Sequence, residues 1–184
     1  VHVITPEQAK QIIFERVFCG VDWGWEHWGA IVVIGVKNGS YYIIEEHAAQ
    51  HKYIKNWIVV AKDIIKRYGD IPFYCDPART EHIAAFQDSG IEAYMANNRV
   101  LSGIEAVATL MTNKQFFIVY SKCPRFREEI YKYIWKKNTG EPLKENDDVL
   151  CAIRYGIYSD MTVNEIELPG KSQMEQAKKL KGLI

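Results

Sequence analysis

Apolar residues gather in short runs separated by polar breaks in the first third of the chain, and this pattern predicts consecutive β-strands. Apolar runs cover residues 17–21 and 30–36, and a third run, 41–46, follows the dipeptide Asn38-Gly39. Asn-Gly supplies the positive φ angles that a tight hairpin turn needs. The chain is therefore expected to open with a three-stranded antiparallel meander.

The spacing of apolar positions changes after the meander. Between residues 53 and 68 they recur in steps of three and four, which predicts an amphipathic helix ending at Gly69. Beyond it, the pattern predicts strands at 71–75, 91–95 and 116–120, and helices at 80–88, 101–113, from 124 onward and at 147–160.

This order of elements predicts an α/β fold. A meander followed by alternating helices and strands forms one mixed sheet with flanking helices, and the ribonuclease H-like architecture has this order. We expect one domain over residues 17–160, preceded by a linker with a short helix in 1–16 and followed by a tail over 161–184.

Composition narrows the class of protein. The 184 residues, 48% of them hydrophobic, suffice for one well-packed core, and 23 basic residues balance 23 acidic ones. With no overall basic field, any DNA contact must come from local patches.

The four cysteines form no C-x-x-C pair, which argues against a zinc or redox site. Without a signal peptide or a long apolar run, we expect a soluble intracellular chain.

Acidic residues stand at the ends of three predicted elements. Asp22 ends the first strand, Asp76 follows the strand at 71–75, and Asp147 and Asp148 open the last helix. Ligands of α/β sheets gather beyond strand ends, and clustered carboxylates repel one another unless a cation binds. Mg²⁺ and Mn²⁺ prefer such oxygen ligands, and two of these ions can catalyse phosphodiester hydrolysis. The pattern therefore indicates a metal-dependent nuclease.

Each acidic residue also has a structural interpretation. Asp22 could serve a turn before Gly24, and Asp76 could form an Asp-Pro turn with Pro77. We favour Asp147 as the N-cap of the last helix, because aspartate accepts hydrogen bonds from free helix amides. Asp148 would then be the preferred metal ligand in the first helical turn.

Three segments together resemble a known family. They are residues 17–24 (VFCGVDWG), 73–78 (FYCDPA) and 145–155 (ENDDVLCAIRY). In this order and spacing they resemble the nuclease domain of tailed-phage terminase large subunits, over roughly residues 16–160. The resemblance implies a ribonuclease H-like endonuclease that cuts concatemeric viral double-stranded DNA during genome packaging.

The resemblance also implies a ligand set. Asp22, Asp76 and either Asp148 or Asp147 would bind two divalent ions, Mg²⁺ or Mn²⁺. Family members often carry a further acidic residue where Cys151 stands, and often a histidine near Asn146 or Asp148. This departure leaves the fourth ligand open.

Terminase large subunits join this nuclease to an ATPase motor. The chain contains no G-x-x-x-x-G-K-[ST] loop, so we do not expect it to bind ATP. The resemblance implies a C-terminal domain of a longer protein, with an N-terminal ATPase domain, the small terminase subunit and the portal as partners. Its location would be the cytoplasm of the infected bacterial cell.

Several basic and aromatic residues are candidates for DNA contact. Arg79, Lys144 and Arg154 lie near the proposed ligands in sequence and could hold phosphates, or could be solvated surface charges. A wider basic rim could include Lys52, Lys55, Arg99, Lys136 and Lys137. Trp23, Trp25 and Trp28 could contact DNA or a partner, although core packing is the interpretation we favour.

Three alternatives remain open from the sequence. A ribonuclease H, resolvase or transposase core would share the carboxylates and differ in substrate. An actin-like or sugar-kinase domain would use residues 21–24 as a phosphate loop and would bind nucleotide. A non-catalytic packaging docking module would not nick DNA in manganese.

Overall fold

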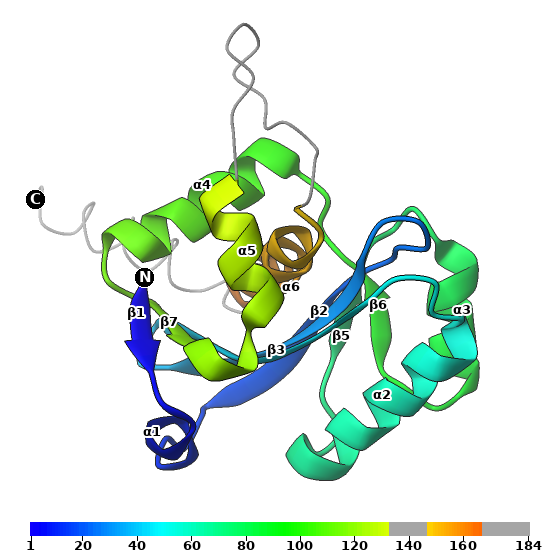
Figure 1. The fold of residues 1–184 in the computed structure, drawn as a ribbon, viewed down its shortest axis with the longest axis horizontal. Coiled ribbons are helices and arrows are strands. Elements are labelled where there is room, and N and C mark those ends of the chain that lie inside the picture. The colour runs from blue at the N-terminus through cyan, green and yellow to red at the C-terminus, as the bar shows by residue number, and fades with distance from the viewer. Residues whose placement is uncertain (133–146, 167–184) are drawn as a thin grey trace, which may run out of the picture.

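A mixed β-sheet runs through the protein (Figure 1). The structure is a computed structural model that describes residues 1–132 and 147–166. Within these residues, seven strands form one sheet in the order β1-β7-β4-β3-β2-β5-β6. Their bounds are β1 (His2–Ile4), β2 (Arg16–Asp22), β3 (Gly29–Lys37), β4 (Ser40–Ala49), β5 (Phe73–Cys75), β6 (Ala93–Met95) and β7 (Phe116–Val119). The predicted α/β class with a mixed sheet is confirmed.

Helices cover both faces of this sheet. Their bounds are α1 (Pro6–Lys10), α2 (Ile54–Tyr68), α3 (Thr80–Asp88), α4 (Val100–Thr112), the 3₁₀ helix η1 (Tyr120–Lys122), α5 (Pro124–Lys132) and α6 (Asp148–Ile166). Figure 1 shows α2 and α3 on one face and α4, α5 and α6 on the other. Each face therefore has its own hydrophobic core.

The antiparallel part of the sheet is the predicted meander. β2 pairs with β3 and β3 with β4, and Asn38 and Gly39 form the turn with φ angles of 49° and 70°. Positive φ at both positions matches the right-handed twist of the hairpin strands.

The parallel part of the sheet places the ends of β2 and β5 next to each other. β5 lies parallel to β2 with Val21 opposite Cys75, and the Asp76 amide donates to the Val21 carbonyl at 2.9 Å. Parallel neighbours end at the same sheet edge. Asp22 and Asp76 consequently stand side by side where β2 and β5 end.

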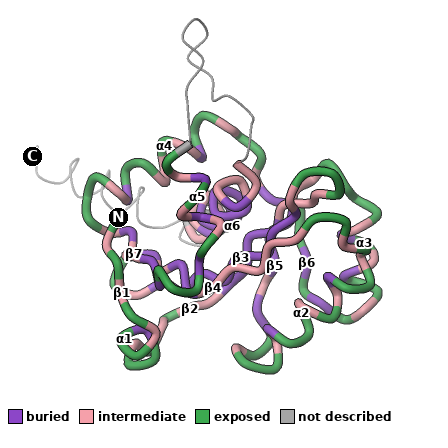
Figure 2. Tube along the Cα trace, in the orientation of Figure 1, coloured by how far each residue is buried: buried purple, intermediate pink, exposed green. Residues whose placement is uncertain are grey.

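Alternation along β2 assigns its side chains to the two cores. Phe18 belongs to the core under α6, whereas Cys19 and Val21 belong to the core under α2 and α3. Successive strand residues point to opposite faces, so Asp22 lies on the α6 face and Trp23 on the α2 face. Figure 2 shows the central strands and α6 as the most deeply buried part of the fold.

Both ends of the domain differ from the expectation. Segment 1–16 contains the short helix α1, but it also contains β1, which pairs with β7 and so belongs to the sheet. The last helix continues past residue 160 to Ile166, and Asp160 lies buried within it with its carboxylate paired with Arg16 at 2.7 Å. Residues 167–184 of the expected tail lie outside the described residues.

Among the helices that the structure describes, none is both long enough and apolar enough to cross a bilayer.

Candidate active site

The carboxylates of Asp22 and Asp76 form the centre of the site. Asp22 is the last residue of β2 and is half-buried. Asp76 follows β5, and its Oδ1 accepts hydrogen bonds from the Ala78 amide at 3.1 Å and from the Tyr155 hydroxyl at 3.2 Å. The bond to Ala78 is the expected turn interaction, while Tyr155 fixes the carboxylate from α6.

The start of α6 brings the other two carboxylates to the same place. Burial raises the pKa of Asp22 well above its ordinary value, and the charges of Asp76, Asp148 and Asp147 raise it further, against the opposing charge of Arg154. Charges act on the pKa of a carboxyl group only over a limited distance, so the start of α6 lies near the ends of β2 and β5. The structure therefore brings together all four acidic residues that the sequence singled out.

Burial and neighbouring charges act on the carboxyl group of Asp148. It is the first residue of α6, and burial followed by the charge of Asp147 raises its pKa, while His27 and Arg125 oppose the rise. A cation placed among these carboxylates would relieve the repulsion.

Asp147 occupies the N-cap position, but another side chain caps the helix. Its carbonyl accepts from the Cys151 amide at 2.7 Å, as an N-cap carbonyl does. The amides of Val149 and Leu150, which an N-cap side chain would bind, instead donate to Oε2 of Glu129 at 2.9 and 3.1 Å. The predicted capping by the Asp147 side chain is thus replaced by capping from α5.

Glu129 is a structural residue of the site that the sequence analysis missed. Its side chain is fully buried, and its second oxygen accepts from Nε of Arg125 at 3.0 Å. Burial raises the pKa of Glu129 to about 7 despite these partners. Glu129 lies twenty residues before its amide partners, so no local pattern in the sequence signals this contact.

Glu129→Ala is expected to lower the free energy of unfolding by roughly 3 kcal/mol, because it leaves two helix amides and Arg125 without their buried acceptor. Denaturant unfolding measures the loss. Glu128→Ala is the matched control, since Glu128 pairs with the same arginine from the surface at 2.9 Å and should cost less than about 1 kcal/mol. Equal losses in the two variants would contradict the capping role.

One face of α6 lines the site. Cys151 and Tyr155 follow Asp148 by three and seven residues, a spacing that places them on the same side of a helix. The Cys151 thiol donates to Oδ2 of Asp147 at 3.6 Å, and burial, followed by the charges of Asp22 and Asp147, keeps the pKa of this thiol well above its ordinary value. This spacing is the signal that could have identified Tyr155 from the sequence.

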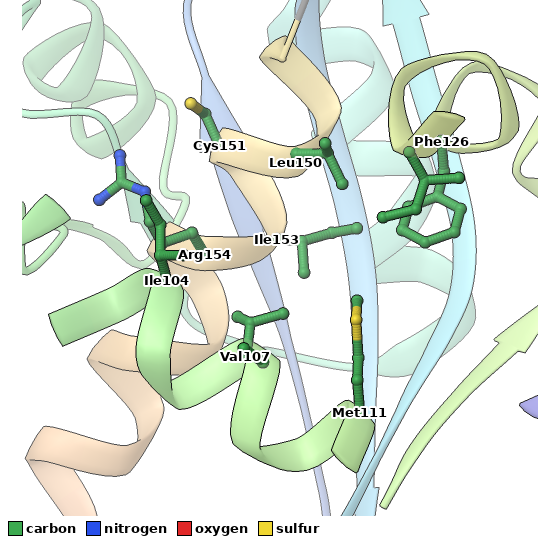
Figure 3. A pocket seen from close by; sticks show the side chains of 10 residues that line it. Ile104, Val107, Met111, Phe126, Leu150, Cys151, Ile153 and Arg154 are labelled. Atoms are coloured by element: carbon green, nitrogen blue, oxygen red, sulfur yellow. The ribbon is translucent and has the colours of Figure 1, made fainter. Parts of the chain in front are cut away.

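Arg154 lies beside the carboxylates and is only 6% exposed. Its guanidinium packs 4.3 Å from the centre of the Tyr155 ring, and its Nη1 is buried without a hydrogen-bond partner in residues 1–132 and 147–166. Figure 3 shows the Arg154 guanidinium and the Cys151 sulfur on the same side of α6, and both residues also line an apolar pocket between α4, α5 and α6. Arg154 is thus a buried neighbour of Asp22 rather than a solvated charge.

The other two basic candidates lie elsewhere. Arg79 is exposed at the start of α3 and pairs with Glu81 at 3.3 Å. Lys144 lies outside the described residues, as do Lys136 and Lys137 of the expected rim.

The three tryptophans Trp23, Trp25 and Trp28 differ in how far they are packed into the fold. Trp23 packs edge-on against Phe86 at 5.2 Å, and its Nε1 donates to the Asp76 carbonyl at 3.2 Å. Arg125 stacks on Trp28 at 4.8 Å. Core packing is therefore correct for Trp23, whereas Trp25 is 39% exposed.

Divalent cations suit the donor chemistry of this site. Four carboxylates supply hard oxygen ligands, and their repulsion is the feature that cation binding would remove. In the present side-chain arrangement, no three acidic, histidine or cysteine residues within the described ranges form a ready-made ion site. Ion binding at the site would consequently require the acidic side chains to rotate.

The sequence matches one protein-family model. The model, described as the terminase RNaseH-like domain, covers residues 19–159 and thus includes all four acidic residues. No curated protein sequence matches this chain.

Solved structures with a similar fold include phage large terminases. The large terminase of a thermophilic bacteriophage, solved in complex with ATP-gamma-S, is 26% identical, with a TM-score of 0.71 over 84% of this chain and 41% of that one. The nuclease domain of the P22 large terminase is 24% identical, with a TM-score of 0.65 over 76% of this chain and 78% of that one. The nuclease domain from bacteriophage SPP1, solved with bound manganese, is 19% identical, with a TM-score of 0.70 over 85% and 92%. These likenesses confirm the ribonuclease H-like fold, and this chain spans less than half of the thermophilic phage terminase.

Proposed function

Because the chain belongs to the terminase family of ribonuclease H-like domains, we propose that it cuts concatemeric viral double-stranded DNA by metal-dependent hydrolysis during genome packaging. The observation that carries this proposal is the meeting of Asp22 and Asp76 at adjacent strand ends with Asp147 and Asp148 at the start of α6. Family membership favours a packaging nuclease over a resolvase or transposase core.

Asp22, Asp76 and Asp148 are the proposed side chains that would hold two divalent ions, Mg²⁺ or Mn²⁺. Glu129, by capping α6, leaves the Asp147 side chain available as a further ligand. When bound, such ions lower the pKa of water and stabilise negative charge on the leaving oxygen.

The surrounding residues have positioning roles in this proposal. Tyr155 holds the Asp76 carboxylate through its hydroxyl group, and Trp23 holds the Asp76 backbone. Arg154 offers a buried Nη1 for a phosphate oxygen close to Asp22. Arg79 and Lys144 are proposed to contact the scissile phosphate or its neighbours.

The partners of the whole protein follow from the same family. The thermophilic phage relative was solved with ATP-gamma-S, and we extend to this chain the proposal of an N-terminal ATPase domain in the full-length protein. The small terminase subunit and the portal complete the set of proposed partners, and the host cytoplasm is the proposed location.

Linear duplex DNA is expected to be the best substrate in manganese, cut with little sequence preference. Rates on an RNA–DNA hybrid and on a four-way junction of the same sequence provide the comparison. Faster cleavage of the hybrid would indicate a ribonuclease H, and faster cleavage of the junction would indicate a resolvase. Failure to nick any of the three would refute the proposed nuclease and favour the docking-module interpretation, with nucleotide binding as the test of the actin-like alternative.

A further inference from the structure

A pocket of about 350 Å³ lies at the same strand ends as the carboxylates, but on the α2 face of the sheet. Trp23, which directly follows Asp22, forms part of its wall. Ligand pockets in proteins typically measure roughly 300–1,000 Å³. The pocket and the acidic site are therefore separated only by the ends of the strands.

Aromatic rings form the mouth of this pocket. Trp25, from the β2–β3 loop, packs against Tyr53 with 4.8 Å between ring centres, and Tyr53 is 61% exposed. The His51 amide donates to the Trp25 carbonyl at 3.0 Å, which ties the two segments together. Exposed aromatic rings held in this way are suited to stacking against a planar ligand.

The charged residues among those described around the pocket are both positive. Lys52 places its ammonium group 4.6 Å from the centre of the Trp57 ring, and Arg79, which pairs with Glu81 at 3.3 Å, lines the pocket from the start of α3. Cations beside exposed aromatic rings favour a ligand that combines a planar ring with negative charge.

His82 adds a polar group to the pocket wall. Its ring packs edge-on against Trp23 at 5.1 Å. Its Nδ1 is buried and has no hydrogen-bond partner in the described part of the chain. After rotation of the His82 ring, this nitrogen can bond to the polar edge of a ligand held against the aromatic side chains.

We propose that this pocket binds an unpaired nucleobase of the DNA strand whose backbone passes the acidic site. The proposal rests on the proposed nuclease function for its choice of DNA. Nucleotides supply both the aromatic ring for Trp25 and Tyr53 and the phosphate for Lys52 and Arg79. Because a base inside a duplex is stacked and paired, the pocket selects strand ends and frayed segments.

Binding of a short single-stranded oligodeoxynucleotide containing 2-aminopurine, measured in EDTA to prevent cleavage, tests the proposal. Stacking should quench the fluorescence of the base. Tyr53→Ala should weaken binding about tenfold, and Tyr53→Phe, which keeps the ring, should bind within about twofold of wild type. Tyr131→Ala is the matched control, because Tyr131, on α5, is also an exposed tyrosine, with 83% of its surface accessible.

Any one of four results would overturn the base pocket. These are no quenching, no binding, wild-type affinity in Tyr53→Ala, or an equal loss of affinity in Tyr131→Ala. The nuclease is assessed separately by duplex cleavage in manganese. If the protein cuts duplex DNA but Tyr53→Ala binds the oligonucleotide as tightly as wild type, only this inference is overturned. A Tyr53-dependent affinity in a protein that cuts no DNA supports the pocket and refutes the proposed function.

Discussion

Asp22→Asn is expected to reduce DNA cleavage in manganese by at least about a thousandfold, the loss that follows from removing several kcal/mol of transition-state stabilisation. Asparagine keeps the size of the side chain but removes the negative charge with which Asp22 would bind the proposed ions. Conversion of supercoiled plasmid to nicked and linear forms measures the rate. Asp70→Asn, which neutralises an exposed aspartate before β5, is the control and should cut like wild type.

The same variant should be more stable than wild type when metal is absent. Burial and neighbouring charges raise the pKa of Asp22 in the folded state. A carboxyl group of this kind contributes its full stability below its unfolded pKa of about 4, and that contribution is lost as pH rises through the folded pKa. Thermal unfolding in EDTA at neutral pH should therefore give a higher Tm for Asp22→Asn, and manganese should raise the Tm of wild type only. A variant that cuts DNA fully, or that unfolds below the wild-type Tm, contradicts the account.

Gly20→Ala is expected to destabilise the fold by more than about 3 kcal/mol or to prevent folding. A Cβ atom at Gly20 would lie 1.9 Å from the Ala152 carbonyl oxygen and 2.9 Å from the Gly156 amide nitrogen, both backbone atoms of α6. The helix that carries Asp148 would have to move away from the strand that carries Asp22. Denaturant unfolding and the yield of folded protein measure the effect.

Gly35→Ala provides the comparison. An added Cβ there would meet the Phe14 ring at 2.6 Å, and this half-buried side chain can swing aside. The expected cost is correspondingly smaller, about 1–2 kcal/mol. Wild-type stability of Gly20→Ala would show that α6 does not cross β2 as closely as described.

Local patterns in the sequence predicted most elements of the fold. The meander follows from alternation and from Asn38-Gly39, and α2 follows from its apolar stripe. β1 was missed because a three-residue strand has too little pattern to be distinguished from a loop. The extent of α6 was missed because Asp160 resembles a surface residue in sequence, while in the structure Arg16 neutralises it in the interior.

The acidic site could be predicted because strand ends and helix starts are readable features. Asp22 and Asp76 converge because β2 and β5 are parallel neighbours. The role of Glu129 could not be predicted, since the contact joins α5 to α6 across a sequence gap and replaces a local cap that aspartate usually provides. The placement of Arg154 beside Asp22 likewise depends on how α6 crosses the sheet.

The measurement that most directly tests the proposed metal centre is anomalous scattering from manganese-soaked crystals of this protein. We expect two manganese peaks with carboxylate oxygens of Asp22 and Asp76 at roughly 2 Å, and with Asp148 as the third protein ligand. Peaks that avoid both Asp22 and Asp76, or no peak at the ends of β2 and β5 under saturating manganese, would contradict it.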